Sequence, residues 1–286
     1  MSRLPNGECS YKAAATALAW NGTKRFLCCG FEDGALFLWS LQEPQWSEMP
    51  FRHSGRVTVV AWSPEGRRVI AGDESGTVSL WRIDSAGSFT FLVKYTKKGQ
   101  ISQCVFKVPP GTDTSNSIEC PPFLIAGDAG VVHLADDAGH CVDFFAVHRP
   151  IAAVVFMEGT QSVLTVTTDA IVSVHRQDGT GKMTQIMKVK VAAASGESAI
   201  RAARLVGPSL LAYLSAEDVI RFWDLRHDNN YVLRLTDVAS AVPSAAAAMA
   251  SSSGGDAGAK KRGMYASWDT SAPPQLQQRK RDCHVR

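Results

Sequence analysis

The stretch VTVVAWSPEGRRVIAGDESGTVSLW, residues 57–81, contains three short apolar segments separated by two turns. Residues 57–62 alternate between two faces, which predicts a half-buried strand. In residues 63–66 (SPEG) a proline presets φ and a glycine adds flexibility, and residues 73–76 (DESG) are typical of a hairpin turn with a glycine at positive φ. Residues 77–81 alternate again and end in tryptophan. The stretch therefore predicts an antiparallel β unit.

The same pattern occurs upstream in residues 15–39, ATALAWNGTKRFLCCGFEDGALFLW, where Glu32-Asp33-Gly34 supplies the hairpin. Four landmark pairs lie 42 residues apart (62 − 20 = 42): Trp20 and Trp62, Gly30 and Gly72, Gly34 and Gly76, Trp39 and Trp81. A fixed period of about 40–45 residues is the signature of WD40 propeller blades.

Three further units follow with looser spacing. Residues 101–106 place Phe106 where Trp62 stands, and residues 124–136 repeat residues 69–81 with one residue fewer in the predicted turn, which makes Gly127, Asp128 and Gly130 the landmarks of this unit. A fourth unit covers residues 151–175, and a fifth covers residues 199–225 and ends in Trp223-Asp224. We therefore predict an all-β, WD40-type β-propeller with about five recognisable blades, in a partial or open seven-bladed ring.

Composition separates a propeller region, residues 1–237, from a low-complexity basic tail, residues 238–286, that we expect to be disordered. Residues 251–286 hold seven Lys/Arg and three Asp/Glu, a sum of +4, so the remainder carries 3 − 4 = −1. A nearly neutral repeat region gives no nucleic-acid footprint. No apolar run long enough to span a membrane occurs, and irregularly spaced cysteines favour a reduced compartment.

The polar residues favour structural roles over chemistry. His53 and Trp81 stand where WD40 units often place a histidine–tryptophan hydrogen-bond network, whereas repeat one keeps Asp33 and Trp39 without a matching histidine. The acid pairs Asp73-Glu74, Asp136-Asp137 and Glu217-Asp218 fall in predicted turns, and Cys28-Cys29 falls in a predicted strand. We find no nucleophile or nucleotide motif and no paired metal-ligand spacing, so we predict no enzyme activity, no cofactor and no metal.

Four stretches add a family resemblance: residues 52–84, 99–111, 183–191 and 219–233. With them the chain resembles the N-terminal WD40 region of the intraflagellar transport protein 140 family, subunits of intraflagellar transport complex A. The resemblance spans roughly residues 10–235. Family members are longer, with tandem propellers and a helical-repeat region, and residue 15 aligns with their second blade. The resemblance therefore implies a fragment or a truncated gene product.

The resemblance implies a scaffold that supports retrograde transport and the assembly of cilia or flagella. Its implied partners are other complex A subunits, with no nucleic acid and no membrane span, and its implied location is the cilium or flagellum, its basal body and the cytoplasm. The alternative functions are a generic WD40 adaptor in another cytoplasmic or nuclear complex and, less favoured, a propeller-type enzyme domain. We expect contact positions in loops, at Trp46 and in the insertion at residues 107–122. An open arc would expose two apolar blade faces, which predicts an unstable or self-associating chain.

Overall fold

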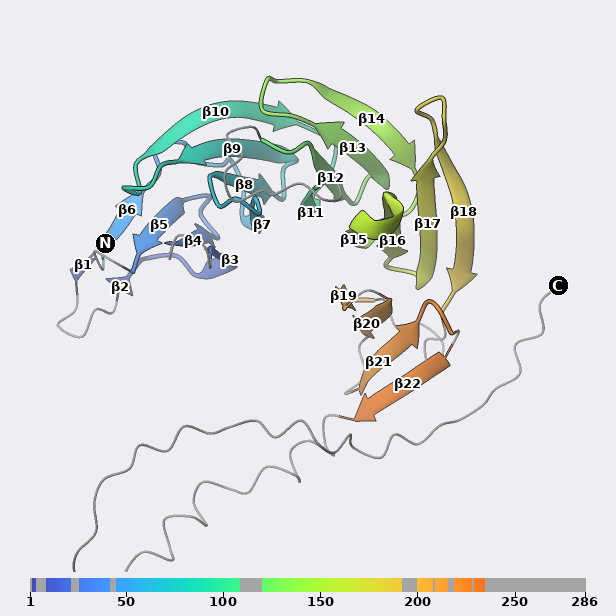
Figure 1. The fold of residues 1–286 in the computed structure, drawn as a ribbon. Coiled ribbons are helices and arrows are strands. Elements are labelled where there is room, and N and C mark those ends of the chain that lie inside the picture. Colours follow the sequence, from blue (N-terminus) through green and yellow to red (C-terminus); the bar gives the residue numbers. More distant parts are fainter. Residues whose placement is uncertain are drawn as a thin grey trace, which may run out of the picture. The chain divides into compact units, whose positions relative to one another are not determined.

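Short antiparallel strands dominate the computed structural model (Figure 1). It describes residues 2–3, 9–21, 26–41, 45–108, 120–191, 200–207, 209–215, 219–227 and 229–234. Within these residues there is one helical turn, η1 (Glu158–Thr160), and no helix long and apolar enough to cross a lipid bilayer. The tail expected to be disordered, residues 238–286, lies outside the described residues.

The described strands form five four-stranded antiparallel sheets, numbered here as blades 1 to 5, besides one pair made of β1 (Ser2–Arg3) and β2 (Cys9–Ser10). Each blade joins four strands that are consecutive in the chain. The prediction of five blades is confirmed. The strands are β3 (Ala15–Asn21), β4 (Phe26–Phe31), β5 (Leu36–Ser40) and β6 (Gln45–Glu48) in blade 1; β7 (Val57–Trp62), β8 (Arg68–Asp73), β9 (Thr77–Ile83) and β10 (Phe89–Thr96) in blade 2; β11 (Ile101–Phe106), β12 (Phe123–Gly127), β13 (Val131–Ala135) and β14 (Cys141–Ala146) in blade 3; β15 (Ile151–Met157), β16 (Ser162–Thr167), β17 (Ile171–Gln177) and β18 (Met183–Lys190) in blade 4; β19 (Ala202–Val206), β20 (Leu210–Leu214), β21 (Val219–Asp224) and β22 (Asn229–Arg234) in blade 5.

The chain divides into two compact units, residues 1–203 and residues 204–286. Blades 1 to 4 belong to the first unit, and almost all of blade 5 belongs to the second. In the first unit the first strands of successive blades contact one another, β3 with β7, β7 with β11 and β11 with β15 (Figure 1). The blades are therefore stacked in chain order, as radial repetition requires.

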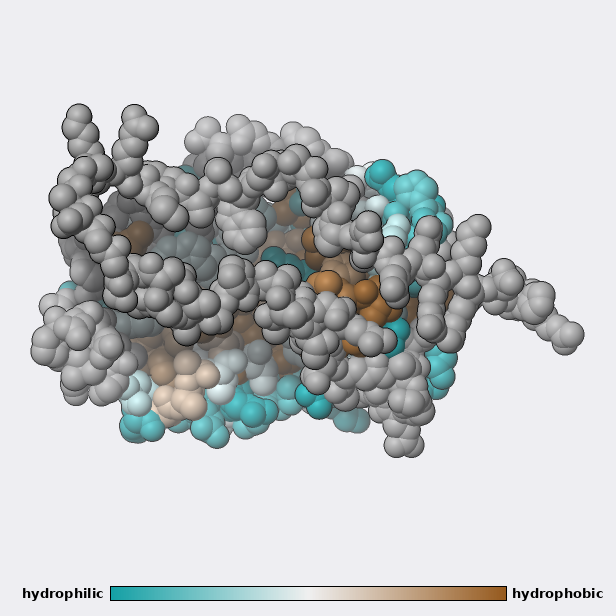
Figure 2. All heavy atoms as spheres, turned by 90° about the horizontal axis from the view of Figure 1, so that it is seen from below, coloured by the Kyte–Doolittle hydropathy of each residue, from teal (hydrophilic) through white to brown (hydrophobic). Residues whose placement is uncertain are grey.

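Apolar side chains from adjacent blades form a separate core at each junction of the first unit. Between blades 1 and 2, Leu36 and Leu38 of one blade meet Val69 and Trp81 of the other. The next two junctions are built alike, from Ile70, Leu80, Ile101 and Phe123, and from Leu124, Val132, Val154 and Val163. In Figure 2 hydrophilic residues line the lower edge of the described surface and hydrophobic atoms lie further in. Each blade thus buries a face that it could not cover alone.

A β-bulge recurs at the start of each blade of the first unit. The pairing of the first strand with the second shifts between Ala15 and Ala17, between Val57 and Val59, and at the equivalent places in blades 3 and 4. The strict alternation predicted for residues 57–62 is therefore wrong, because the bulge inserts one extra residue and Val57 and Val60 are both buried.

The hairpin turn between the second and third strands has one geometry in four blades. Gly34, Gly76 and Gly130 have positive φ (80°, 91° and 69°), and Ala170 occupies the same place with φ 66°. The carbonyl of each accepts a hydrogen bond from the backbone N–H that follows the blade's outer strand, as Lys97 donates to Gly76 at 2.8 Å and Val191 to Ala170 at 2.9 Å. The turn therefore anchors the connection to the next blade.

The third unit differs from its predicted alignment. In blade 2 strand pairing sets Val69 opposite Trp81, and the equivalent pair in blade 3 is Phe123 opposite Ala135. Ala126 therefore corresponds to Gly72. The turn thus has the same length as in blade 2, and the prediction of one residue fewer is wrong. The sequences were matched at Ala-Gly, whereas backbone pairing matches the turn glycines Gly76 and Gly130.

Ala170 is the one position of this turn in the first four blades that lacks glycine, and this predicts a stabilising substitution. The left-handed conformation costs a residue with a Cβ about 1–2 kcal/mol, which the greater entropy loss of glycine only partly offsets. We expect Ala170→Gly to raise the free energy of unfolding by about 0.5–1 kcal/mol in urea denaturation. A loss of stability in this variant would contradict the assignment of Ala170 to the left-handed position of the turn.

Candidate functional site

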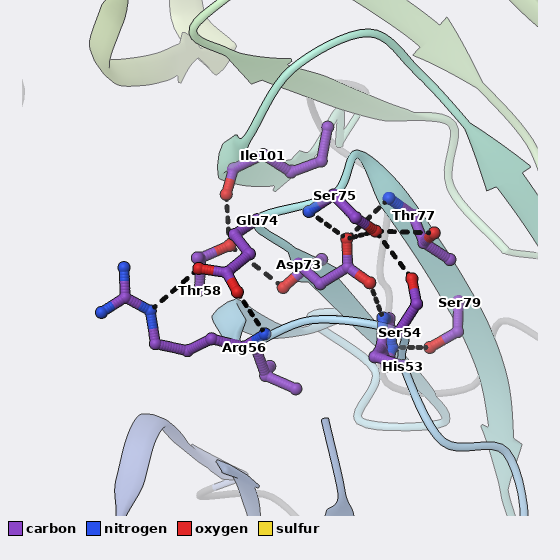
Figure 3. A network of polar contacts seen from close by, with 12 residues as sticks. His53, Ser54, Arg56, Thr58, Asp73, Glu74, Ser75, Thr77, Ser79 and Ile101 are labelled. Atoms are coloured by element: carbon purple, nitrogen blue, oxygen red, sulfur yellow. Dashed lines mark hydrogen bonds and ion pairs between the residues drawn. The ribbon is translucent and has the colours of Figure 1, made fainter. Parts of the chain in front are cut away.

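Buried polar side chains form a hydrogen-bond network in blade 2 (Figure 3). His53 Nδ1 lies 3.0 Å from Asp73 Oδ2, and His53 Nε2 lies 2.9 Å from Ser79 Oγ, which accepts a hydrogen bond from Trp81 Nε1 at 3.1 Å. The other carboxylate oxygen, Asp73 Oδ1, accepts hydrogen bonds from the N–H of Ser75 (2.9 Å) and the N–H of Thr77 (2.8 Å). The network joins the segment that follows blade 1 to two strands and the turn of blade 2.

The partners of His53 define its protonation. Burial lowers the pKa of His53 and outweighs the opposing hydrogen bond and charge of Asp73, which favours the neutral ring. A neutral ring that donates from Nδ1 to Asp73 accepts the Ser79 hydroxyl on Nε2. Each side-chain polar group of His53 and Ser79 then has a hydrogen-bond partner inside the network.

In blade 1 aromatic rings occupy the corresponding positions. Counting back 42 residues from His53, Asp73 and Ser79 (53 − 42 = 11, 73 − 42 = 31, 79 − 42 = 37) leads to Tyr11, Phe31 and Phe37. These three rings pack edge to face with centroid distances of 4.7, 5.0 and 5.4 Å. The same junction is thus made with an apolar cluster in one blade and a polar network in the next.

Asp33 and Asp73 are therefore not equivalent, although both were singled out as hairpin landmarks. Asp33 stands at the place of Ser75 and accepts a hydrogen bond from Tyr11 Oη at 2.9 Å. Arg52 Nη1 lies 3.3 Å from the same carboxylate oxygen, and Arg52 Nη2 donates to Tyr11 Oη at 2.7 Å. This partly exposed group ties residue 11 to the hairpin of blade 1.

The strand glycines among the landmarks leave no room for a side chain. A Cβ on Gly30 would come within 2.7 Å of Val57 Cβ, and one on Gly72 within 2.7 Å of Ile101 Cγ2. A Cβ on Gly127, at the place of Asp73, would overlap the carbonyl oxygen of Gln100. At Gly30 and Gly72 a side chain of the next blade fills the space that a Cβ would need, and at Gly127 the backbone that leads into the first strand of the same blade fills it.

Sequence reasoning missed a set of hydroxyl groups at the bulges. The hydroxyl of Thr16 donates to Val57 O at 2.6 Å, that of Thr58 donates to Ile101 O, and that of Ser102 donates to Ile151 O at 2.7 Å. Each bond joins the first strand of one blade to the first strand of the next. The signal in the sequence was a Thr or Ser one residue after the start of the first strand in blades 1 to 3.

The other residues that the sequence analysis chose as blade landmarks are tryptophans and aspartates of blades 2, 3 and 5. Trp62 Nε1 donates to Ala19 O at 2.9 Å, and Trp223 is buried in blade 5. Asp224 lies 2.7 Å from His227 Nδ1, and this hydrogen bond, first among several, lowers its pKa to about 2. Asp128 lies in the hairpin of blade 3 beside Gly130.

Other expectations meet different outcomes. Trp46 was expected in a loop but lies in β6, paired with Trp39, so that expectation is wrong. Of the insertion at residues 107–122, residues 109–119 lie outside the described residues, as does the pair Glu217-Asp218. Cys28 and Cys29 are buried strand residues, and burial raises the pKa of the Cys28 thiol. Within the described ranges, no group of three His, Cys, Asp or Glu side chains is placed to hold a metal ion.

Buried histidines predict that the first unit loses stability in mild acid. Burial lowers the pKa values of His53, His133 and His175 below the usual value of about 6.5. Below about pH 6.5 the unfolded chain binds protons at these histidines, whereas the folded chain does not. The free energy of unfolding is therefore highest above about pH 6.5 and decreases as the pH falls toward the folded-state pKa values. We expect the urea midpoint to fall between about pH 7.5 and pH 5.5.

His175 allows this pH dependence to be tested at one residue. Its ring stacks on Phe145 with centroids 4.2 Å apart, and its Nδ1 has no hydrogen-bond partner among the described residues. His175→Phe keeps an aromatic ring in the stack and removes one titrating group, so the slope of the urea midpoint against pH should decrease. An unchanged slope in this variant, or a flat profile in the parent, would contradict the prediction.

The fold resembles several solved propellers. It matches the computationally designed Ika8 protein (TM-score 0.57, 22% identity) over 78% of this chain and 62% of that chain. It matches the C-terminal WD40 domain of Sif2 (TM-score 0.59, 19% identity) over 77% of this chain and 58% of that chain. It also matches the Cps50 (Swd1) beta-propeller domain of Myceliophteria thermophila (TM-score 0.58, 18% identity) over 75% of this chain and 66% of that chain. The chain thus spans less than two thirds of these propellers, and the likeness concerns the fold.

Five four-stranded blades, the turn glycines and the histidine–tryptophan network define the molecule as a WD40-type β-propeller. A sequence model described as the IFT140 first beta-propeller matches residues 2–120 and residues 114–284. The chain belongs to this family, and the resemblance inferred from the four sequence stretches is confirmed.

Proposed function

We propose that the chain is a non-enzymatic scaffold of intraflagellar transport complex A, which supports retrograde transport and the assembly of cilia or flagella through protein–protein contacts. Membership of the IFT140 first beta-propeller family carries this proposal, because the matched residues span nearly the whole chain. Its partners are other complex A subunits, and its location is the cilium or flagellum, its base and the cytoplasm.

The geometry of the polar residues supports binding rather than catalysis. In blade 2 the carboxylate of Asp73 and the ring of His53 are directed at each other and at the backbone, at 0% side-chain exposure for both. A general base must instead reach a substrate proton. Rigid sheets with exposed loops and outer strands suit a surface that holds other proteins.

Imaging and co-purification test the proposal. The protein, tagged in its own ciliated or flagellated cell, should concentrate at the base and along the axoneme and should co-purify with complex A subunits. Asp73→Ala, which we expect to destabilise blade 2, should reduce the recovery of the subunits, whereas the exposed-turn variant Asp84→Ala should retain them. A diffuse or nuclear distribution without complex A subunits would overturn the proposal and favour a generic WD40 adaptor.

A further inference from the structure

The outer strand of blade 4 has an edge with which no described strand pairs. In the sheet order β15-β16-β17-β18, β18 (Met183–Lys190) is the last strand, and Figure 1 shows it on the outer side of β17. Most of its residues are exposed, and among its apolar side chains Ile186 is 52% and Val189 is 38% exposed. The strand therefore presents an open sheet edge, where backbone donors and acceptors can pair with another chain.

The backbone groups that face outward on this edge follow from the strand pairing. The N–H of Val191 donates to Ala170 O at 2.9 Å, so Val191 is bonded toward β17. In an antiparallel ladder the residues alternate between backbone groups bonded to the neighbour and backbone groups directed away from it. Pairing with β17 is regular over residues 187–190, so the N–H and C=O of Lys188 and Lys190 are directed away from β17.

The side chains of these two residues carry charge on the same edge. Lys188 and Lys190 are exposed, and their spacing of two residues places them on one face of the strand. Neither forms an ion pair with a described residue, and β18 contains no Asp or Glu. Outward-facing backbone groups and uncompensated positive charge therefore coincide at two alternate positions.

The outer strands of blades 2 and 3 carry charges that have partners within the molecule. The one charged residue of β10, Lys94, has its Nζ 5.8 Å from the centre of the Phe51 ring. The one charged residue of β14, Asp143, lies 2.8 Å from His133 Nδ1. Among these three outer strands, the lysines of β18 alone are without such a partner in the described residues.

We infer that β18 is a docking edge for an extended acidic segment of a partner protein, which adds a further strand to blade 4 with its acids opposite Lys188 and Lys190. Residues opposite each other on paired strands share a face, and opposite charges there attract. Because successive residues alternate between faces, the partner's acids stand at every second position, with an apolar residue between them beside Val189. This inference does not depend on the proposed function.

Charge argues against three other occupants of this edge. A second copy of β18 would bring lysines close to lysines, and lysines on edge strands are a known device against such pairing. Residues 251–286 carry a charge of +4 and would be repelled as well. Two lysines on a region of charge −1 supply too few phosphate contacts for nucleic-acid binding.

Two peptides test the inference on the full chain. The first has the length of β18, 8 residues, and alternates glutamate with valine, and the second has lysine in place of each glutamate. We expect saturable binding of the glutamate peptide in fluorescence anisotropy and none of the lysine peptide. Amide hydrogen exchange should slow at Lys188 and Lys190 when the glutamate peptide is added, because their N–H groups become hydrogen-bonded.

Charge reversal separates docking at β18 from a general attraction. The variant Lys188→Glu/Lys190→Glu should bind the glutamate peptide about tenfold more weakly or worse and should bind the lysine peptide instead, since two attractive cross-strand pairs become repulsive. The control Lys97→Glu/Lys98→Glu makes the same change of charge in the connection between blades 2 and 3, and it should leave binding nearly unchanged. All four positions lie outside the apolar cores, so both variants should keep the circular dichroism spectrum of the parent.

Three results would overturn the inference. The first is the absence of saturable binding by the glutamate peptide, and the second is an equal loss of affinity in the control variant. The third is unchanged binding of a glutamate peptide with methylated backbone nitrogens, which lacks the N–H donors that strand addition requires and would bind by charge alone. Vesicles that contain phosphatidylserine serve as a further probe: if they slow exchange at Lys188 and Lys190 and the glutamate peptide does not, the ligand is a lipid surface and the inference is wrong.

Discussion

Replacement of Asp73 by alanine should lower the free energy of unfolding by about 3–5 kcal/mol, because it leaves buried partners without an acceptor. The carboxylate is completely buried and accepts hydrogen bonds from His53, from Ser75 and from the N–H of Thr77. Each of these donors would lose its partner where water cannot replace it. Urea denaturation of the purified chain, followed by circular dichroism, measures the loss.

Asp84→Ala is the matched control for this substitution. Asp84 accepts backbone hydrogen bonds from Ala86 and Ser88, both at 2.9 Å, but it lies in an exposed turn. Water can replace its contacts, so the expected loss is at most about 1 kcal/mol. The double variant His53→Leu/Asp73→Ala should lose less unfolding free energy than the two single variants lose together, by about 1 kcal/mol or more, because the two side chains share one network. Equal losses for Asp73→Ala and Asp84→Ala would refute a dominant role for the network.

Gly76→Ala should cost about 3 kcal/mol or more, since it combines backbone strain with a steric conflict. Gly76 has φ +91°, and a Cβ there would overlap the carbonyl oxygen of Lys97 and lie 2.9 Å from that of Gly99. Both carbonyls belong to the connection between blades 2 and 3. The substitution therefore disturbs a junction as well as a turn, and the same urea titration measures its effect.

Gly181→Ala separates the two contributions. Gly181 has φ +88°, nearly that of Gly76, but the only described atom near its added Cβ is Gln177 Nε2 at 3.6 Å. Its substitution should cost only the left-handed strain, about 1–2 kcal/mol. The difference between the two variants then measures the conflict with the connection. If both variants lose the same amount, the contact with Lys97 contributes nothing to stability.

Local signals explain why the blades could be predicted. A hairpin with positive φ favours glycine, and Gly34 and Gly76 recur at the same spacing as the closing tryptophans Trp39 and Trp81. The outer strands carry weaker signals, because they are half-exposed and irregular in composition, and Trp46 was expected in a loop for that reason.

Details of the junctions could not be predicted. Matching Ala-Gly in residues 126–127 to residues 71–72 misaligned the third unit by one residue, since only backbone pairing distinguishes a turn glycine from a strand glycine. Likewise Asp33 and Asp73 look alike in the sequence, yet one lies beside Tyr11 and Arg52 and the other beside His53. The partner of each is supplied by a segment about 20 residues away.

The sequence by itself determined the blade architecture, its order and its family, because period, turn chemistry and strand alternation are properties of neighbouring residues. Only the tertiary structure decided which residues are equivalent between blades, which hydroxyls join one first strand to the next, and that Trp20 stays half-exposed while Trp81 is buried. The physical reason is that these features are contacts between sheets, such as hydrogen bonds between residues 41 to 49 positions apart, where burial depends on the facing blade and leaves no local pattern.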